Sequence, residues 1–97
     1  MIESGTQTIL LVEDYKDSRE MIRLLLEEQG YWILEAQNGK EAIELAARQT
    51  PDLVLTDFNL PDIDGTTLTK RLRKQNACSK TTPHQLRKLI LPISYDN

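Results

Sequence analysis

The amino-acid sequence predicts a single α/β domain built on a doubly wound parallel sheet. Short apolar runs rich in branched residues suit strands that are buried on both faces, and three occur here: Ile9–Val12, Tyr31–Ala36 and Leu53–Thr56. A segment with apolar residues at helical spacing follows each run, so strands and helices alternate along the chain. A chain of 97 residues is long enough for one such domain.

Three helices are expected between and after these strands, over residues 17–29, 40–49 and about 66–75. Asp17 or Ser18 is the expected N-cap of the first helix, and Gly30 is well placed to end it. The turn at Asn38-Gly39 leads into the second helix, which Pro51 helps to terminate. Four apolar residues of this second helix are expected to face inward: Ala42, Ile43, Leu45 and Ala46.

The pattern weakens after Gln75. Pro83 is followed by His84-Gln85-Leu86-Arg87-Lys88, which is not a buried strand. The apolar residues near Leu89 suit a short helix or, equally, a poor strand that contains Pro92. Because proline lacks an N–H group, such a strand would be tolerated only at the edge of a sheet. We therefore expect a domain over residues 1–83 and a divergent tail over residues 84–97.

Composition and charge exclude several classes of protein. No apolar stretch approaches the ~20 residues of a membrane span, and no secretory signal is visible. Cys78 is the only cysteine, which favours a cytoplasmic location. Residues 1–69 hold 14 acidic and 5 basic residues, whereas residues 70–97 hold 7 basic residues and one acidic residue. No aromatic residue interleaves these bases and no DNA-binding motif accompanies them, so we expect a solvated surface and no nucleic-acid binding.

Acidic residues follow two of the three predicted strands. Glu13 and Asp14 come directly after the first strand, and Asp57 follows the third. Ligands of open α/β sheets bind beyond the carboxyl ends of the strands, so these three carboxylates converge if the two strands are neighbours. Carboxylates at close range repel one another, and a hard divalent cation relieves that repulsion. Oxygen ligands of this kind suit Mg²⁺ or Mn²⁺.

A carboxylate beside such a cation can attack a phosphoryl group, because the metal neutralises the phosphoryl oxygens as they transfer. The product would be an aspartyl phosphate. The simpler interpretation is that acids after strands only cap helices and loops. That interpretation would be preferred for Asp14 alone, but Asp57 and the loop after it favour the metal site.

Two segments make this interpretation specific. Ile9–Asp14 and Asp52–Gly65 closely resemble the receiver domains of two-component response regulators, which have a flavodoxin-like fold. Gly30-Tyr31 and the Ala36-x-Asn38-Gly39 sequence also lie where that family has a G-Y pair and an A-x-N-G motif. The resemblance covers about residues 8–83.

The resemblance implies a role for each matching residue. Asp57 would be the phospho-acceptor, Asp14 a direct ligand of Mg²⁺, and Glu13 a ligand that acts through metal-bound water. Asn59 would give its backbone carbonyl to the metal. The implied partner is a sensor histidine kinase or a histidine phosphotransfer protein that docks on the first helix. Such a domain accepts a phosphoryl group and is not expected to be an enzyme.

The chain departs from the family after Pro83. A complete receiver has a fourth strand ending in Thr or Ser and a fifth ending in Lys, and this sequence has neither in the matching place. Ser94 follows an apolar run but lies several residues too late to be a favoured substitute. The abrupt change suggests a frameshifted or early-terminated coding sequence. An uncovered edge of the third strand would then favour a homodimer or a strand-exchanged oligomer.

Two alternative functions are also considered. The chain could be a phosphorylation-deficient receiver that acts only as a protein-interaction module. Asp62-Ile63-Asp64-Gly65-Thr66 also resembles the D-x-D-G-T motif of haloacid-dehalogenase-like phosphatases, which would use Asp62 and Asp64. That motif needs an apolar strand directly before its first aspartate, whereas the predicted strand ends earlier, so the phosphatase is not favoured.

Overall fold

The computed structural model describes residues 7–57, 59–78 and 91–93. Strands and helices alternate in the order β1 (Thr8–Val12), α1 (Lys16–Glu28), β2 (Trp32–Ala36), α2 (Gly39–Arg48), β3 (Leu53–Asp57), α3 (Gly65–Cys78) and β4 (Leu91–Ile93). The three predicted strand–helix units are therefore confirmed, with ends that differ by a few residues. No helix in the described ranges is long and apolar enough to cross a bilayer.

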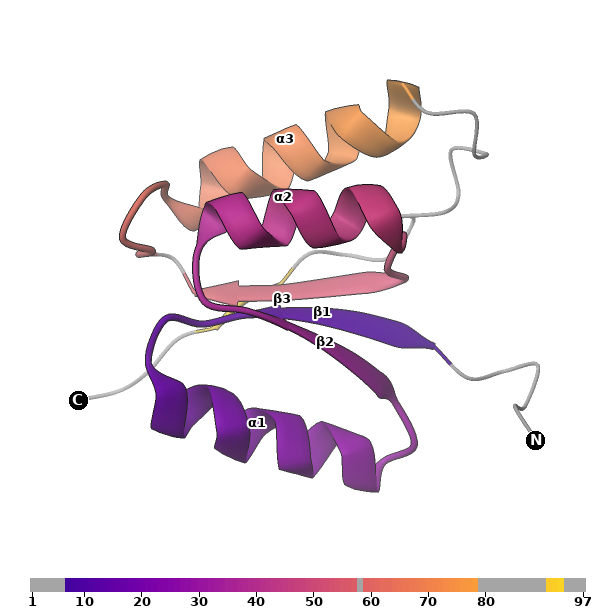
Figure 1. Cartoon of the computed structure of the whole chain (residues 1–97), viewed down its shortest axis with the longest axis vertical. Helices are drawn as coiled ribbons and strands as arrows, with labels where there is room; N and C mark the ends of the chain where they lie inside the picture. Colours follow the sequence, from indigo (N-terminus) through magenta and orange to yellow (C-terminus); the bar gives the residue numbers. More distant parts are fainter. Residues whose placement is uncertain (1–6, 58, 79–90, 94–97) are drawn as a thin grey trace.

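The sheet has the strand order β2-β1-β3-β4, and every pairing in it is parallel. α1 covers one face of the sheet, while α2 and α3 lie side by side on the other (Figure 1). β1 is an inner strand that pairs with β2 from Thr8 to Val12 and with β3 from Ile9 to Val12. The carboxyl ends of β1 and β3 consequently meet at the same edge of the sheet.

The main hydrophobic core lies between the sheet and the α2–α3 layer. Leu10 and Val12 of β1 contribute to it, and Ile9 and Leu11 alternate with them toward the α1 face. All four are no more than 1% exposed, which explains why the run is continuously apolar. The helices add Ala42, Ala46, Leu68 and Leu72 to this core. Ile43 and Leu45 pack against it while partly exposed, as the predicted inward face requires.

The predicted N-cap of α1 is wrong. The N-cap is Tyr15, which makes no side-chain capping hydrogen bond. Its own N–H donates to the Glu13 carboxylate at 3.0 Å, so Glu13 organises the turn that enters the helix. The other end agrees with the sequence. Gly30 has a φ of 95°, and the Gly30 and Tyr31 N–H groups donate to the last carbonyls of the helix in a Schellman motif.

β4 lies in the C-terminal tail, for which the sequence allowed either a short helix or a strand. It pairs with β3 from Leu55 to Asp57 and forms the edge of the sheet, where Pro92 is tolerated. The expectation of an uncovered β3 edge is therefore wrong for these three residues. Ser94 and residues 79–90 lie outside the described part of the chain.

The loop between β3 and α3 closes onto the start of α2. Asn38 is the N-cap of α2, and its side chain accepts the Glu41 N–H at 2.8 Å. The Asp62 carboxylate accepts the N–H groups of Gly39 and Lys40 at 2.9 and 3.0 Å. An added Cβ at Gly39 would collide with Cγ2 of Ile63, so glycine is what allows this close approach.

Replacing Gly39 with alanine should therefore lower the free energy of unfolding by about 1–3 kcal/mol, because the loop must move away from the helix. Helix propensity alone would change the stability in the opposite direction, by about 1 kcal/mol. Urea unfolding of Gly39→Ala measures the sign of this change in the free energy of unfolding. The exposed Ala47 of the same helix serves as a control, since Ala47→Gly reports the propensity effect without a steric one. A Gly39→Ala variant more stable than the wild type would contradict the close approach.

Candidate metal centre

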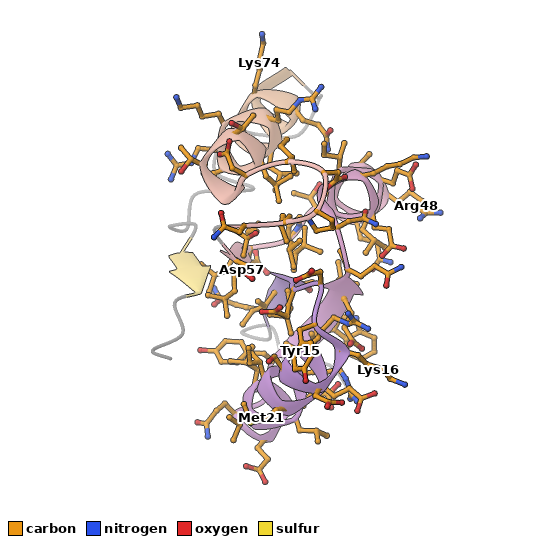
Figure 2. The ribbon with its side chains drawn as sticks, turned by 90° about the vertical axis from the view of Figure 1, so that its left-hand side faces the viewer. Tyr15, Lys16, Met21, Arg48, Asp57 and Lys74 are labelled. Carbon is orange, nitrogen blue, oxygen red and sulfur yellow. The ribbon has the colours of Figure 1, made fainter. Side chains whose placement is uncertain are left out.

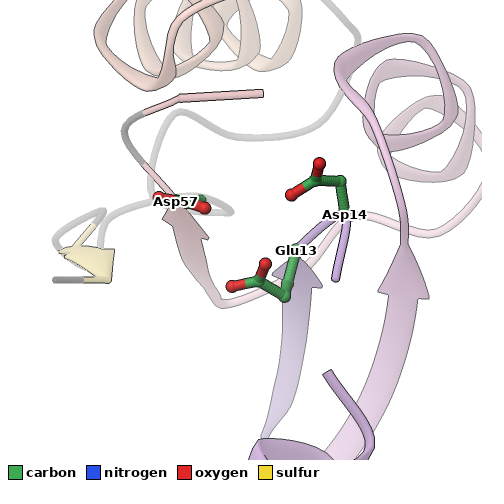
Figure 3. Close-up of side chains that lie close together, drawn as sticks. All are labelled: Glu13, Asp14 and Asp57. Atoms are coloured by element: carbon green, nitrogen blue, oxygen red, sulfur yellow. The ribbon is translucent and has the colours of Figure 1, made fainter. Parts of the chain in front are cut away.

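Three carboxylates meet at the edge of the sheet where β1 and β3 end. Val12 pairs with Thr56, so Glu13, Asp14 and Asp57 leave their strands at the same level. One oxygen of each side chain lies within 4.8 Å of the other two. Figure 3 shows the Glu13 and Asp14 carboxylates on the side that faces Asp57. The predicted convergence of these three acids is therefore present in the fold.

The three side chains differ in their exposure. Glu13 is only 1% exposed, Asp57 is half-buried and Asp14 is exposed. The Glu13 main-chain N–H donates to the Ala36 carbonyl at 3.0 Å, which ties the end of β1 to β2. A buried carboxylate is costly unless hydrogen bonds or a cation compensate for its lost hydration. Glu13 is thus the buried member of the cluster, and Asp14 is its exposed member.

The electrostatics of this cluster favour a cation. Two unit charges 4.8 Å apart repel by about 3 to 4 kcal/mol at an effective dielectric constant near 20, and by less where solvent reaches Asp14. Within the described residues, neither Asp14 nor Asp57 forms an ion pair with a basic side chain. A set of oxygen ligands with two accessible members fits Mg²⁺ or Mn²⁺, which keep several water ligands.

The residues beside Asp57 hold its backbone and carboxylate. The buried Thr56 hydroxyl donates to the Asp57 main-chain carbonyl at 3.1 Å, an interaction that the sequence did not reveal. The Asn59 N–H donates to Oδ1 of Asp57 at 3.4 Å, a long contact. Asn59 also forms an antiparallel bridge with Asp64, which closes the loop. The Asn59 carbonyl as a metal ligand remains a prediction.

Asp62 and Asp64, the two acids of the phosphatase alternative, are engaged elsewhere. Asp62 holds the start of α2, and the hydrogen bond from the Gly39 N–H is the main cause that lowers its pKa. Asp64 accepts the N–H and the hydroxyl of Thr67 at the start of α3, and these bonds lower its pKa. Neither residue belongs to the carboxylate cluster found among the described residues.

One basic residue contacts the cluster's backbone and was missed by the sequence analysis. Nη1 of Arg19 donates to the main-chain carbonyl of Glu13 at 2.9 Å. Arg19 lies in the first turns of α1. Helical periodicity predicts which side of the helix such a residue lies on, but not which residues it contacts. Its partner on β2, Glu35, is 16 residues away in sequence, and no local pattern connects the two.

Comparison with known proteins found related sequences and solved structures. The response regulator receiver domain matches residues 9–85. The polar-differentiation response regulator DivK of Brucella anthropi is 37% identical over 67 residues, which are 69% of this chain and 54% of DivK. The crystal structure of the receiver domain from the hybrid histidine kinase CckA is 41% identical, with a TM-score of 0.66 over 70% of this chain and 65% of that one.

A further solved relative was determined with ligands. Response regulator TrrA of Thermotoga maritima, in complex with Mg²⁺ and BeF, is 35% identical, with a TM-score of 0.70 over 74% of this chain and 63% of TrrA. The chain spans about half the length of curated relatives such as DivK.

The lowered pKa of Asp62 predicts how stability depends on pH. A carboxyl whose pKa falls below 3.8 on folding stabilises the fold above that pH, and the contribution is lost as pH falls through the lowered value. Asp62→Asn should therefore destabilise the protein near neutral pH, and its difference from the wild type should shrink in acid. Urea unfolding at several pH values measures this, with Glu44→Gln on the exposed face of α2 as the charge control. A difference that stays constant in acid would refute the capping role.

Proposed function

The chain belongs to the response regulator receiver domain family, and from that premise we propose that Asp57 accepts a phosphoryl group in a reaction that requires Mg²⁺. Receiver domains are phosphoryl-acceptor signalling domains rather than conventional enzymes. The observation that carries the proposal is the approach of Glu13, Asp14 and Asp57 to within 4.8 Å of one another at the ends of β1 and β3. The relative TrrA, solved with Mg²⁺ and BeF, supports the choice of metal.

The residues of the cluster have different roles in this reaction. Mg²⁺, or Mn²⁺ in its place, would be held by Glu13, Asp14, Asp57 and the Asn59 carbonyl. When bound, it would neutralise charge on the transferring phosphoryl oxygens. One carboxylate oxygen of Asp57 attacks phosphorus, the bond from phosphorus to the donor breaks, and an acyl phosphate forms. The half-buried position of Asp57 leaves it accessible to a donor, while Thr56 holds its main chain and the Asn59 N–H contacts its carboxylate.

The donor that we propose is a sensor histidine kinase or a histidine phosphotransfer protein. α1 begins two residues after Asp14, so its first turn follows directly on the carboxylate cluster. Its exposed apolar side chains Met21, Leu24 and Leu25 are 55–57% exposed and suit a docking partner. Figure 2 shows Met21 on the outer side of this helix, away from the sheet. A cytoplasmic location accompanies this partner class as part of the proposal.

We also propose the extent of the domain. We place the receiver over residues 1–83 and the divergent tail over residues 84–97, and the family match, which ends at residue 85, supports this division. We also propose that the receiver self-associates, as a homodimer or by strand exchange. β4 has only three residues, and within the described part of the chain nothing pairs with its outer side.

Incubation with a small phosphodonor and Mg²⁺ tests the function. The wild type should gain the mass of one phosphoryl group, and the gain should be labile in base and absent with a chelator. Asp57→Asn should abolish the gain, whereas Asp62→Asn, which changes a helix-capping acid of the same charge, should keep it. Intact mass spectrometry reads all arms.

Other outcomes of this experiment support other functions. No gain in a folded wild type that still binds a kinase would favour an interaction module without phosphotransfer. Hydrolysis of the donor that is lost in Asp62→Asn would favour a phosphatase. A gain that survives Asp57→Asn would show that Asp57 is not the acceptor.

Self-association should appear as a molar mass that rises with concentration in size-exclusion chromatography with light scattering. Pairing along the β4 edge would be disturbed by a charge, so Leu91→Lys should shift the chain toward the monomer, whereas Lys74→Glu, on the solvent side of α3, should not. A monomer at every concentration would exclude the proposed dimer.

A further inference from the structure

We propose that Arg19 is a positioning residue of the metal centre, which fixes the peptide between Glu13 and Asp14 and thereby the direction of the Asp14 carboxylate. The inference deepens the proposed function and rests on it for the identity of the ligand. Within the described residues, the Arg19 side chain bonds the Glu13 carbonyl and Glu35, and neither bond is to a carboxylate of the proposed metal ligands. It acts through the backbone of Glu13.

The geometry of the Arg19 side chain carries the proposal. Nη1 donates to the Glu13 carbonyl at 2.9 Å, and Nε donates to Oε1 of Glu35 on β2 at 3.3 Å. The side chain of Arg19 is only 16% exposed. A guanidinium is a rigid planar fork, so two partners on different edges define both its position and its orientation. Arg19 thereby links the Glu13 carbonyl to Glu35 on β2 and fixes its position.

The backbone of Glu13 is held on both sides. Its N–H donates to the Ala36 carbonyl at 3.0 Å, and its carbonyl accepts from Arg19. The carbonyl belongs to the peptide plane that joins Glu13 to Asp14, so fixing it fixes the direction in which the chain enters Asp14. One contact from β2 and one from α1 therefore determine where the exposed ligand Asp14 begins.

Asp14 depends on this backbone more than the other two acids do. The Glu13 carboxylate accepts the Tyr15 N–H at 3.0 Å, and the Asp57 carboxylate accepts the Asn59 N–H at 3.4 Å. Within the described residues, the Asp14 side chain makes no hydrogen bond or ion pair. Its place within 4.8 Å of the other two acids therefore comes from its main chain.

Arg23 offers a matched comparison one turn further along α1. Nε of Arg23 lies 3.0 Å from Oε2 of the same Glu35, and Nη1 of Arg23 donates to Oε1 of Glu27 at 3.1 Å. Within the described residues, Arg23 makes no hydrogen bond to Glu13. The two arginines thus share helix, charge and acidic partner. Arg19 bonds the Glu13 carbonyl, the contact to which we assign the positioning role, whereas Arg23 bonds Glu27 instead.

Charge and geometry predict opposite effects on metal affinity. A positive side chain near the cluster opposes a dication, so removal of the charge alone would strengthen Mg²⁺ binding. Loss of positioning would weaken it instead. An arginine-to-lysine exchange keeps the charge but removes the fork that reaches two partners at once, so it isolates the geometric effect.

Calorimetric titration of the full chain with Mg²⁺ and hydrogen exchange of the metal-free protein test the proposal together. Arg19→Lys should weaken Mg²⁺ binding by about 10-fold or more, as losses of residues that orient metal ligands typically do. Exchange of the Glu13 amide should also become faster. Arg23→Lys should leave both quantities near their wild-type values, and equal urea midpoints for the two variants would exclude a general loss of folding.

Two results would overturn the positioning role: wild-type Glu13 amide exchange in Arg19→Lys, or equal weakening of Mg²⁺ binding by both exchanges. The amide readout needs no metal, so the proposed function can fail separately. If the wild type binds no Mg²⁺ but exchange of the Glu13 amide is faster only in Arg19→Lys, then Arg19 positions the Glu13 backbone and the proposed metal binding is wrong.

Discussion

The parallel pairing of β1 with β3 places Val12 opposite Thr56, and the position of every acid in the metal centre follows from that register. Glu13 and Asp14 continue from one strand and Asp57 ends the other, so their carboxylates must share one small space. A slip of one residue would turn each strand's buried side chains to the wrong face, which the core residues Leu10, Val12 and Val54 do not permit. The hydrophobic core therefore fixes the register, and the register builds the site.

This arrangement opposes stability at the site that it creates. Domains of this size are stabilised by only about 5–15 kcal/mol in total, so repulsion of a few kcal/mol among three acids is a substantial fraction. The surrounding contacts limit where that repulsion can be relieved. Glu13 is buried and tied to β2, and the loop after Asp57 is held by Asp62 at α2 and by Asp64 at α3. Uptake of a dication would lower the energy of the cluster.

Periodic and local features were predictable from the sequence. The continuous run at Ile9–Val12, the turn at Gly30 and the acids after two strands each follow from rules that act over a few residues, and each is present. Two of the features that were missed join distant segments: Arg19 bonds Glu35, and Asp62 bonds Gly39. The N-cap was missed for a local reason, since the N–H of Tyr15 donates to the buried Glu13 carboxylate and the helix begins before Asp17 or Ser18. β4 was left undecided because Pro92 suits a strand only where an edge is available, and the edge is set by the sheet rather than by the tail.

Thermal unfolding of the wild type and of Asp57→Asn, each with a chelator and with excess Mg²⁺, tests most directly whether the three acids share one cation. Relief of repulsion should make Asp57→Asn the more stable protein in chelator. Mg²⁺ should then raise the melting temperature of the wild type, by an amount equivalent to about 2.7 kcal/mol at 100 times its dissociation constant, and change Asp57→Asn far less. Equal responses of the two proteins to Mg²⁺, or a less stable Asp57→Asn in chelator, would contradict a shared metal centre.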